Sequence, residues 1–265
     1  MIDFLAFPGG THRIVTFSYD DGPEQDVRLV ALFNKYGVKA TFHLNSKYYL
    51  GYTPEQIAAV RDLYSGHEIA CHTVHHGHLT EMPAATMINE IIDDRRILEQ
   101  IAGYPVTGMS YPYGSVDDNT VNTLRACGIT YSRTVNATEQ FIMPHDFLRW
   151  DPTCHHKQAL QRSEHFLNDL KNPTRQPLFY IWGHSYEFAT KEDWAEIETL
   201  VSSLAGKPEI WYATNGEICA YRAAQRALVV SADEMMIHNP TAIDVWINKD
   251  REPLCIPTSE TVYLD

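Results

Sequence analysis

Hydrophobic positions switch repeatedly between two spacings along most of the chain. Apolar and polar residues alternate over residues 13–19, which predicts a strand with two different faces. A helical spacing follows, and Gly37 is a typical residue at which a helix ends. The residues at this i, i+3, i+4, i+7 spacing are Leu29, Leu32, Phe33 and Tyr36. The pattern therefore predicts a strand that leads into an amphipathic helix.

The same unit of strand and helix is predicted seven times in succession. The predicted strands cover residues 13–19 and 39–45, short runs that end near Cys71 and Tyr111, and residues 129–134, 178–182 and 209–213. The predicted helices cover the segment around Leu29, a segment opened by a capping box at Thr53, a segment carrying Met87, Ile91, Leu98 and Ile101, residues 117–126 and 157–170, and segments that begin near Thr190 and Asn215. An irregular stretch precedes the helix at 157–170. Such alternation is typical of a parallel sheet with crossover helices, either a barrel or a doubly wound sheet. Because no GxGxxG or P-loop motif follows a strand, an open nucleotide-binding sheet is less favoured.

From Leu228 onward the pattern changes to short β-like runs. These runs cover residues 243–248, 254–256 and 261–264, and Asn-Pro and Lys-Asp turns separate them. The sequence therefore predicts a main domain at residues 1–227 and a small β-rich appendage at residues 228–265.

Composition excludes several classes of partner. The chain has 265 residues with 21 basic and 34 acidic side chains, a net charge of −13, and no cluster of Lys and Arg that could neutralise nucleic-acid phosphates. No apolar run approaches the roughly 18 residues of a membrane span, and the first residues lack the pattern of a signal peptide. The five cysteines are scattered without a CxxC pair, which is typical of reduced thiols. We expect a cytoplasmic protein without a nucleic-acid or membrane partner.

Two adjacent carboxylates directly follow the first predicted strand. A turn in the sequence Asp20-Asp21-Gly22-Pro23 needs only one Asp, and two adjacent carboxylates repel each other. One interpretation is a structural turn. The other is that a cation neutralises one carboxylate and leaves the other as a base.

Four histidines lie within seven residues after the third predicted strand. His72 and His76 are four residues apart, so one helical turn would point both imidazoles the same way. Two imidazoles and one carboxylate leave open positions for water and substrate, as a hydrolytic metal site requires. The alternative is a solvated, His-rich loop, and His75 and His78 are expected to point elsewhere.

Candidate residues gather at the carboxyl ends of the predicted strands. His184 ends the sixth strand, where it fits the role of a general acid better than that of a buried core residue. The candidates at five strand ends are Asp20 and Asp21, His72 and His76, residues 111–113, Arg133, and His184. Barrel enzymes build their active sites at this edge.

These residues resemble the polysaccharide deacetylase family, the chitin-deacetylase-like carbohydrate esterases with a nodulation-protein homology domain. The resemblance covers about residues 14–221. Its three specific motifs are Phe17-Ser-Tyr-Asp20-Asp21-Gly22 for Thr-Phe-Asp-Asp-Gly, His72-Thr73-Val-His-His76 for His-Ser/Thr-x-x-His, and Phe179-Tyr-Ile181-Trp-Gly-His184 for Leu-x-Ile-x-x-His. The resemblance implies a distorted, TIM-like (β/α)7–8 barrel as the catalytic domain, and hydrolytic removal of an N-acetyl or O-acetyl group from a carbohydrate.

The resemblance also implies roles for the site residues. Asp21, His72 and His76 would hold one divalent metal ion, zinc by ligand type or another first-row ion. That ion would polarise the acetyl carbonyl and lower the pKa of water. Asp20 would be the catalytic base, and His184 would protonate the leaving amine.

Further residues are expected around the substrate. By resemblance, the backbone N–H of Tyr113 would hold the oxyanion. Trp150, Ile181 and Phe179 would line a pocket for the acetyl methyl group. Tyr186 would stack on a sugar face.

Two family motifs are degenerate in this chain. They read Ser110-Tyr111-Pro112-Tyr113, without the leading Arg, and Asp146-Phe-Leu-Arg149-Trp150, with Arg in place of the second Asp. We hypothesise that Arg149 restores the lost ion pair with the base Asp20, with Arg133 as a competitor for this role. The partner of His184 must then come from elsewhere, and Asp146 or Asp151 is the nearest acidic candidate.

Alternatives remain open at this stage. The same metal site could hydrolyse another amide, such as a small cyclic ureide, and the two degenerate motifs also allow an inactive carbohydrate-binding protein. The run Cys154-His155-His156 is interpreted as a surface segment before a helix, with a second metal site as the alternative.

Overall fold

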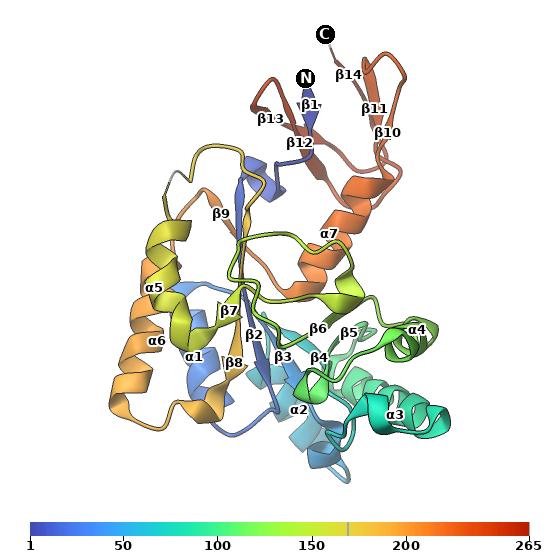
Figure 1. Cartoon of the computed structure of the whole chain (residues 1–265), viewed down its shortest axis with the longest axis vertical. Coiled ribbons are helices and arrows are strands. Elements are labelled where there is room, and N and C mark those ends of the chain that lie inside the picture. The colour runs from blue at the N-terminus through green and yellow to red at the C-terminus, as the bar shows by residue number, and fades with distance from the viewer. Residues whose placement is uncertain (169, 265) are drawn as a thin grey trace.

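A curled parallel sheet surrounded by helices forms the body of the protein. The structure, a computed structural model, describes residues 1–168 and 170–264. The strands of the sheet, all paired in parallel, are β2 (Arg13–Asp20), β3 (Ala40–Leu44), β4 (Glu68–Cys71), β5 (Gly108–Ser110), β6 (Tyr131–Arg133), β7 (Cys154–His155), β8 (Leu178–His184) and β9 (Ile210–Tyr212). Their order is β6-β5-β4-β3-β2-β8-β7, and β9 pairs with the first half of β2 (Figure 1). The predicted β/α barrel architecture is confirmed.

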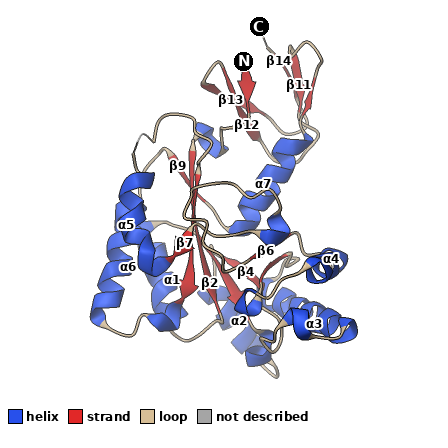
Figure 2. Cartoon of the chain, in the orientation of Figure 1, coloured by secondary structure: helices blue, strands red, loops and turns tan. Residues whose placement is uncertain are grey.

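Helices cover the outside of this sheet (Figure 2). They are α1 (Asp26–Tyr36), α2 (Pro54–Leu63), α3 (Ala84–Ala102), α4 (Asp118–Ala126), α5 (His156–Phe166), α6 (Lys191–Leu204) and α7 (Asn215–Ala227). Each helix lies where apolar residues at helical spacing predict one. The capping box predicted at Thr53 is present. The helix predicted at 157–170 ends at Phe166, and residue 169 lies outside the described residues. No helix among the described residues is long and apolar enough to cross a membrane.

The stretch predicted to be irregular closes the barrel. Trp150 forms a parallel bridge with Arg133 of β6, and its backbone N–H donates to the carbonyl of Ser132 at 3.0 Å. A few residues later, the Thr153 N–H donates to the carbonyl of Tyr180 in β8 at 2.9 Å. Residues 150–155 therefore bridge β6 and β8. Because β7 itself has only two residues, no periodicity could reveal it.

The pleat of the strands separates an outer core from an inner one. On β2, Phe17 and Tyr19 point outward and pack on Phe33 of α1, with ring centroids 4.8 and 5.9 Å apart. The alternate residues Ser18 and Asp20 point inward and contact Arg133, which ends β6. A second cluster of buried residues fills the inside of the barrel and its amino end. The polar inward positions therefore gather at the carboxyl ends of the strands.

Both chain termini lie in a small β module at one end of the molecule (Figure 1). Its two antiparallel sheets are β1 (Ile2–Asp3), β12 (Val245–Lys249) and β13 (Glu252–Ile256), and β10 (Val229–Val230), β11 (Met236–His238) and β14 (Thr261–Tyr263). The three β runs predicted after Leu228 are therefore present. β1 pairs with β12, so this module also takes in residues that the predicted boundary assigns to the barrel. The strand β2 runs away from the module, which leaves the carboxyl ends at the opposite side.

A buried carboxyl group makes stability depend on pH. Asp26 is 1% exposed and accepts hydrogen bonds from the hydroxyls of Tyr64 and Ser185. Burial raises the pKa of Asp26 from 3.8 to about 7. Between these pKa values the folded state keeps a proton that the unfolded chain has released. The free energy of unfolding therefore falls as pH rises, by at most about 1.4 kcal/mol per pH unit.

In urea titrations from pH 4 to 7, the free energy of unfolding of Asp26→Asn should fall less steeply than that of the wild type. The exposed variant Asp62→Asn should follow the wild type, and parallel pH curves for wild type and Asp26→Asn would contradict this assignment.

Candidate active site

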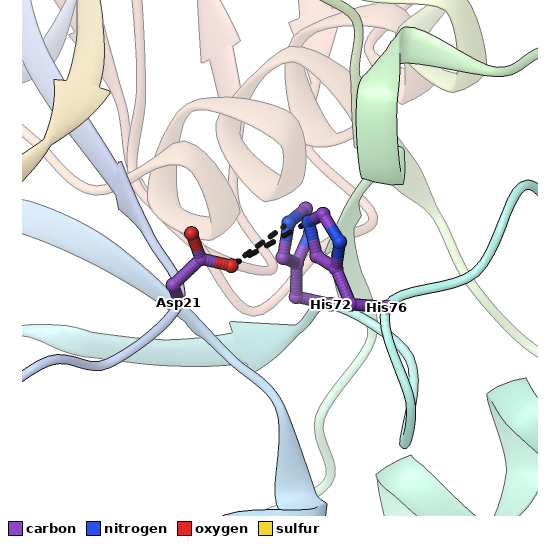
Figure 3. Close-up of side chains that lie close together, drawn as sticks. All are labelled: Asp21, His72 and His76. Carbon is purple, nitrogen blue, oxygen red and sulfur yellow. Dashed lines mark ion pairs between the residues drawn. The ribbon is translucent and has the colours of Figure 1, made fainter.

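A carboxylate and two imidazoles converge at the carboxyl ends of β2 and β4. Asp21 follows β2, and His72 and His76 follow β4 (Figure 3). Oδ1 of Asp21 lies 3.7 Å from Nε2 of His72 and 3.5 Å from Nε2 of His76. Three potential ligand atoms from these residues lie within 4.8 Å of one another. The structure therefore brings together the three residues that the sequence predicts as metal ligands.

The two histidines meet through a loop and not through the helical turn that we expected. Thr73 and His76 have left-handed φ angles of 65° and 59°, and the Thr73 hydroxyl accepts a hydrogen bond from the His76 N–H at 2.9 Å. Asp21 is also left-handed, with φ of 78°. Non-glycine residues adopt this conformation at a cost, and such strain concentrates at functional sites. The i, i+4 spacing was therefore informative, but its helical explanation was wrong.

Contacts behind His72 prepare its Nε2 atom for a metal ion. Its Nδ1 lies 2.9 Å from the carbonyl of Ser110, which requires the proton on Nδ1 and leaves the Nε2 lone pair facing Asp21. The His72 backbone N–H donates to the buried carboxyl of Asp94 at 3.0 Å. Burial lowers the pKa of His72, which favours the neutral form that binds metals. Two oriented imidazoles and one carboxylate fit a first-row divalent ion.

The second carboxylate, Asp20, is held by an arginine from β6. Asp20 is 2% exposed, forms an ion pair with Arg133, and accepts a hydrogen bond from the Ser110 hydroxyl at 3.1 Å. Burial alone would raise the pKa of Asp20, but the Arg133 guanidinium and then His72 hold that pKa well below its usual range. Asp20 is therefore ionised and oriented, as a catalytic base must be.

The hypothesis that Arg149 pairs with Asp20 is wrong. Arg149 lies in a 3-10 turn and forms ion pairs with Asp118 at 2.5 Å and Asp146 at 3.0 Å. Arg133 is fully buried and lies inside the barrel, where its guanidinium carbon is 4.3 Å from the centre of the Trp182 ring. Arg133 reaches Asp20 because it ends a strand and points into the barrel. Arg149 lies on a partly exposed turn and pairs with other carboxylates.

The partner of His184 is also a residue that sequence reasoning missed. Nδ1 of His184 lies 2.7 Å from Oε1 of Glu187, and its Nε2 lies 4.0 Å from Oδ2 of Asp21. The expected partners are engaged elsewhere, because Asp146 pairs with Arg149 and Asp151 accepts a hydrogen bond from Thr134. The turn η6 (Ser185–Glu187) brings residues i and i+3 together, so a Glu three positions after His184 was the available signal.

The comparison with known proteins agrees with this geometry. Residues 9–132 match the sequence model described as polysaccharide deacetylase. This part of the chain is similar to the polysaccharide deacetylase family. The matched region contains Asp20, Asp21, His72 and His76. Arg133 and His184 lie beyond it, so their assignment depends on the geometry and on the motif after β8.

Curated proteins are similar to this chain over part of their length. The peptidoglycan-N-acetylmuramic acid deacetylase PdaC of Bacillus subtilis is 31% identical over 109 residues, which are 40% of this chain and 22% of that protein. The peptidoglycan-N-acetylglucosamine deacetylase of Bacillus cereus is 31% identical over 119 residues, 43% of this chain and 42% of that protein. A chitin deacetylase of Pestalotiopsis is 31% identical over 112 residues, 42% of this chain and 38% of the relative. These matches span less than half the length of each relative.

Solved structures share the fold at low sequence identity. A Mycobacterium smegmatis protein assigned to the polysaccharide deacetylases has a TM-score of 0.64 and 18% identity, with 84% of this chain and 94% of that chain covered. A family 4 acetyl xylan esterase from Clostridium thermocellum, solved with a cobalt ion, has a TM-score of 0.51 and 20% identity, with 80% of this chain and 92% of that chain covered. These likenesses confirm the predicted distorted barrel.

Three residues predicted to line an acetyl pocket belong to the packed core of the protein. Trp150, Phe179 and Ile181 are all fully buried. Phe179 and Ile181 point outward from β8 into the cluster between sheet and helices, because they alternate with the inward-pointing residues of that strand. Trp150 packs inside the barrel against Tyr131 and other aromatic rings. The pocket prediction is therefore wrong for Phe179 and Ile181, and Trp150 has no exposed surface for a ligand.

The two predicted tyrosines do lie at the site. Tyr186 is 47% exposed, and its ring stacks on His184 with centroids 4.9 Å apart. Tyr113 has a left-handed φ of 57°, and its ring lies 4.5 Å from that of His76. A groove of about 1120 Å³ opens beside them. The aromatic residues on its wall are Tyr48, Tyr49, Tyr52, His75, His76, Tyr113 and Tyr186.

Changes to the His184–Glu187 pair should reduce turnover without removing metal. His184→Ala is expected to lower kcat by about 10²–10⁴-fold, because a positioned general acid contributes that much. Glu187→Gln should lower kcat less and leave KM unchanged, since glutamine keeps the shape but loses the charge that faces the protonated imidazole. Acetate-release kinetics and metal analysis would check both. Glu192→Gln, at an exposed position of α6, should behave as the wild type, and unchanged kcat in His184→Ala would reduce His184 to a packing role.

Proposed function

We propose that this domain is a divalent-metal-dependent hydrolase that removes N-acetyl, or O-acetyl, groups from a carbohydrate. One observation carries the proposal. The carboxylate of Asp21 faces His72 and His76 on one side and His184 on the other, and beside it Asp20 is kept ionised by Arg133. This arrangement supplies metal ligands, a base and an acid around one point.

The residues divide the chemistry of amide hydrolysis among them. A divalent ion held by Asp21, His72 and His76 would supply Lewis acidity to the acetyl carbonyl. Asp20 accepts the proton of the attacking water, and Arg133 keeps its carboxylate ionised and fixed in direction. His184 donates a proton to the leaving amine.

Two further groups support these steps. The Glu187 carboxylate orients the His184 ring through the contact at Nδ1. Burial opposes ionisation of Glu187, but Lys157 and His184 lower its pKa to about 2, so it stays charged. The proposal assigns the oxyanion contact to the backbone N–H of Tyr113, a residue with a left-handed φ beside His76.

A carbohydrate substrate is supported by the groove and by the relatives. Exposed tyrosine rings, such as Tyr48, Tyr113 and Tyr186, offer flat apolar faces with a polar edge beside the proposed metal site. The curated relatives are named as deacetylases of peptidoglycan or chitin. We therefore propose an acetylated sugar polymer or oligosaccharide as the partner of this groove.

The deciding experiment measures metal content and acetate release together. Metal-loaded protein would be incubated with N-acetylglucosamine oligosaccharides and acetylated xylan, and Asp20→Asn would serve as the inactive control. Acetate release by the wild type alone supports the proposal. Bound metal without acetate release would favour hydrolysis of another amide, such as a cyclic ureide, and absence of both would favour a carbohydrate-binding protein.

A further inference from the structure

A second group of potential metal ligands lies behind His184. His155 ends β7, His156 begins α5, and Glu187 lies in η6, next to the end of β8. One potential ligand atom from each of these three residues lies within 4.8 Å of the others. Nε2 of His155 is 3.0 Å from Oε1 of Glu187. The carboxyl edge of β7 and β8 therefore presents two imidazoles and one carboxylate together.

His156 has no hydrogen-bond partner for either ring nitrogen. The residue is 6% exposed, and both Nδ1 and Nε2 are buried without a partner. Its ring packs between Tyr19 and Phe188, with centroids 5.8 and 4.6 Å away. Buried polar atoms nearly always have a hydrogen-bond or metal partner. The described side chains supply no such partner to the ring nitrogens of His156.

We propose that His155, His156 and Glu187 form a second site for a first-row divalent cation such as zinc. Ligands at about 2.0–2.1 Å from a tetrahedral metal lie about 3.3 Å from each other, close to the His155–Glu187 separation. Lys157 pairs with Oε2 of Glu187 and leaves Oε1 for the metal. A small cavity of about 30 Å³ lined by His156, Lys157 and Glu187 gives room for one water ligand. The carboxylate of Asp193 also lines this cavity and favours a cation there.

Occupancy of this second site should reduce catalysis, an effect that rests on the proposed function. Oε1 of Glu187 is also the atom that faces Nδ1 of His184, at 2.7 Å. A cation bound to this oxygen occupies the acceptor of the His184 Nδ1 contact, so the ring of the general acid loses the group that orients it. The inferred site is therefore inhibitory, and excess metal should slow an enzyme whose first site is already filled.

Metal counting tests the second site independently of catalysis. In equilibrium dialysis of the full chain against micromolar Zn²⁺, we expect two equivalents for the wild type and one each for His156→Phe and His76→Ala. Phenylalanine keeps the ring that packs between Tyr19 and Phe188. The exposed variant His165→Gln, also on α5, should keep two equivalents. A single equivalent in the wild type would overturn the proposal.

A second variant covers the case in which His156→Phe does not fold. His155 has a side chain that is 19% exposed, so His155→Gln should fold, as far-UV circular dichroism would check, and should bind one equivalent. Retention of two equivalents by either folded variant would overturn the site. With turnover as the readout, a tenfold excess of zinc should slow the wild type and leave His156→Phe unaffected. If the wild type binds two equivalents of zinc but releases no acetate, the proposed function is contradicted and the second metal site is still supported.

Discussion

Replacing Arg133 by alanine is expected to lower turnover by about 10²–10³-fold while the metal stays bound. Arg133 is the cation that faces Asp20 inside the barrel, and both side chains are almost fully buried. Without the guanidinium, the largest influence that lowers the pKa of Asp20 is lost while burial remains, so that pKa rises and less of the base is ionised at a given pH. The acidic limb of the pH–rate profile should therefore move to higher pH, which steady-state kinetics from pH 5 to 9 would measure.

The same substitution should also destabilise the fold. Removing one partner of a buried ion pair typically costs about 3–5 kcal/mol, because the other charge is left without compensation. The double variant Asp20→Asn/Arg133→Ala should regain much of this stability in thermal unfolding, since it removes the orphaned charge, but should stay inactive. The double variant therefore separates the effect of Arg133 on stability from its effect on turnover.

Two further variants sharpen the assignment of the arginine. Arg149→Ala removes an arginine that pairs with Asp118 and Asp146, and should leave turnover unchanged. Ser110 and Arg133 are partners in the register of β5 and β6, so Ser110→Arg/Arg133→Ser moves the guanidinium to the neighbouring strand and should restore part of the activity. If Arg149→Ala were the damaging variant and Arg133→Ala the silent one, the assignment would fail.

Loss of the first metal ion is the other large effect that we expect. His72→Ala and His76→Ala should each remove one tightly bound equivalent and lower turnover by at least about 10³-fold, because the ion polarises the carbonyl at the reacting centre. Each variant leaves two of the three proposed ligands. Metal analysis after dialysis against a weak chelator, with kinetics on the same samples, would measure both effects.

Neighbouring histidines provide matched controls for this prediction. His75 is exposed and bonds to Glu90, and His78 stacks on Tyr113, so neither faces Asp21. His75→Ala should keep the metal, as expected for a groove residue that does not face Asp21. Unchanged metal content in both His72→Ala and His76→Ala would contradict the assignment of these residues as ligands of the first site.

The sequence by itself determined the alternation of strands and helices and the edge at which the chemistry lies. The repeated alternation of strand and helix patterns located seven of the eight strands of the barrel sheet, and it missed the two-residue β7. The motifs around Asp20, His72 and His184 could be recognised since each is local and follows a strand. The division at residues 227/228 and the cytoplasmic location stay predictions.

Only the tertiary structure decided which side chains meet. The partner of Asp20 is 113 positions away in the chain, and sequence alone could not choose between Arg133 and Arg149. The direction of the pleat removed Phe179 and Ile181 from the proposed pocket, and left-handed residues replaced the expected helical turn at His76. Each of these outcomes depends on contacts between distant strands, and the physical reason is that local patterns set the period of an element but not its neighbours.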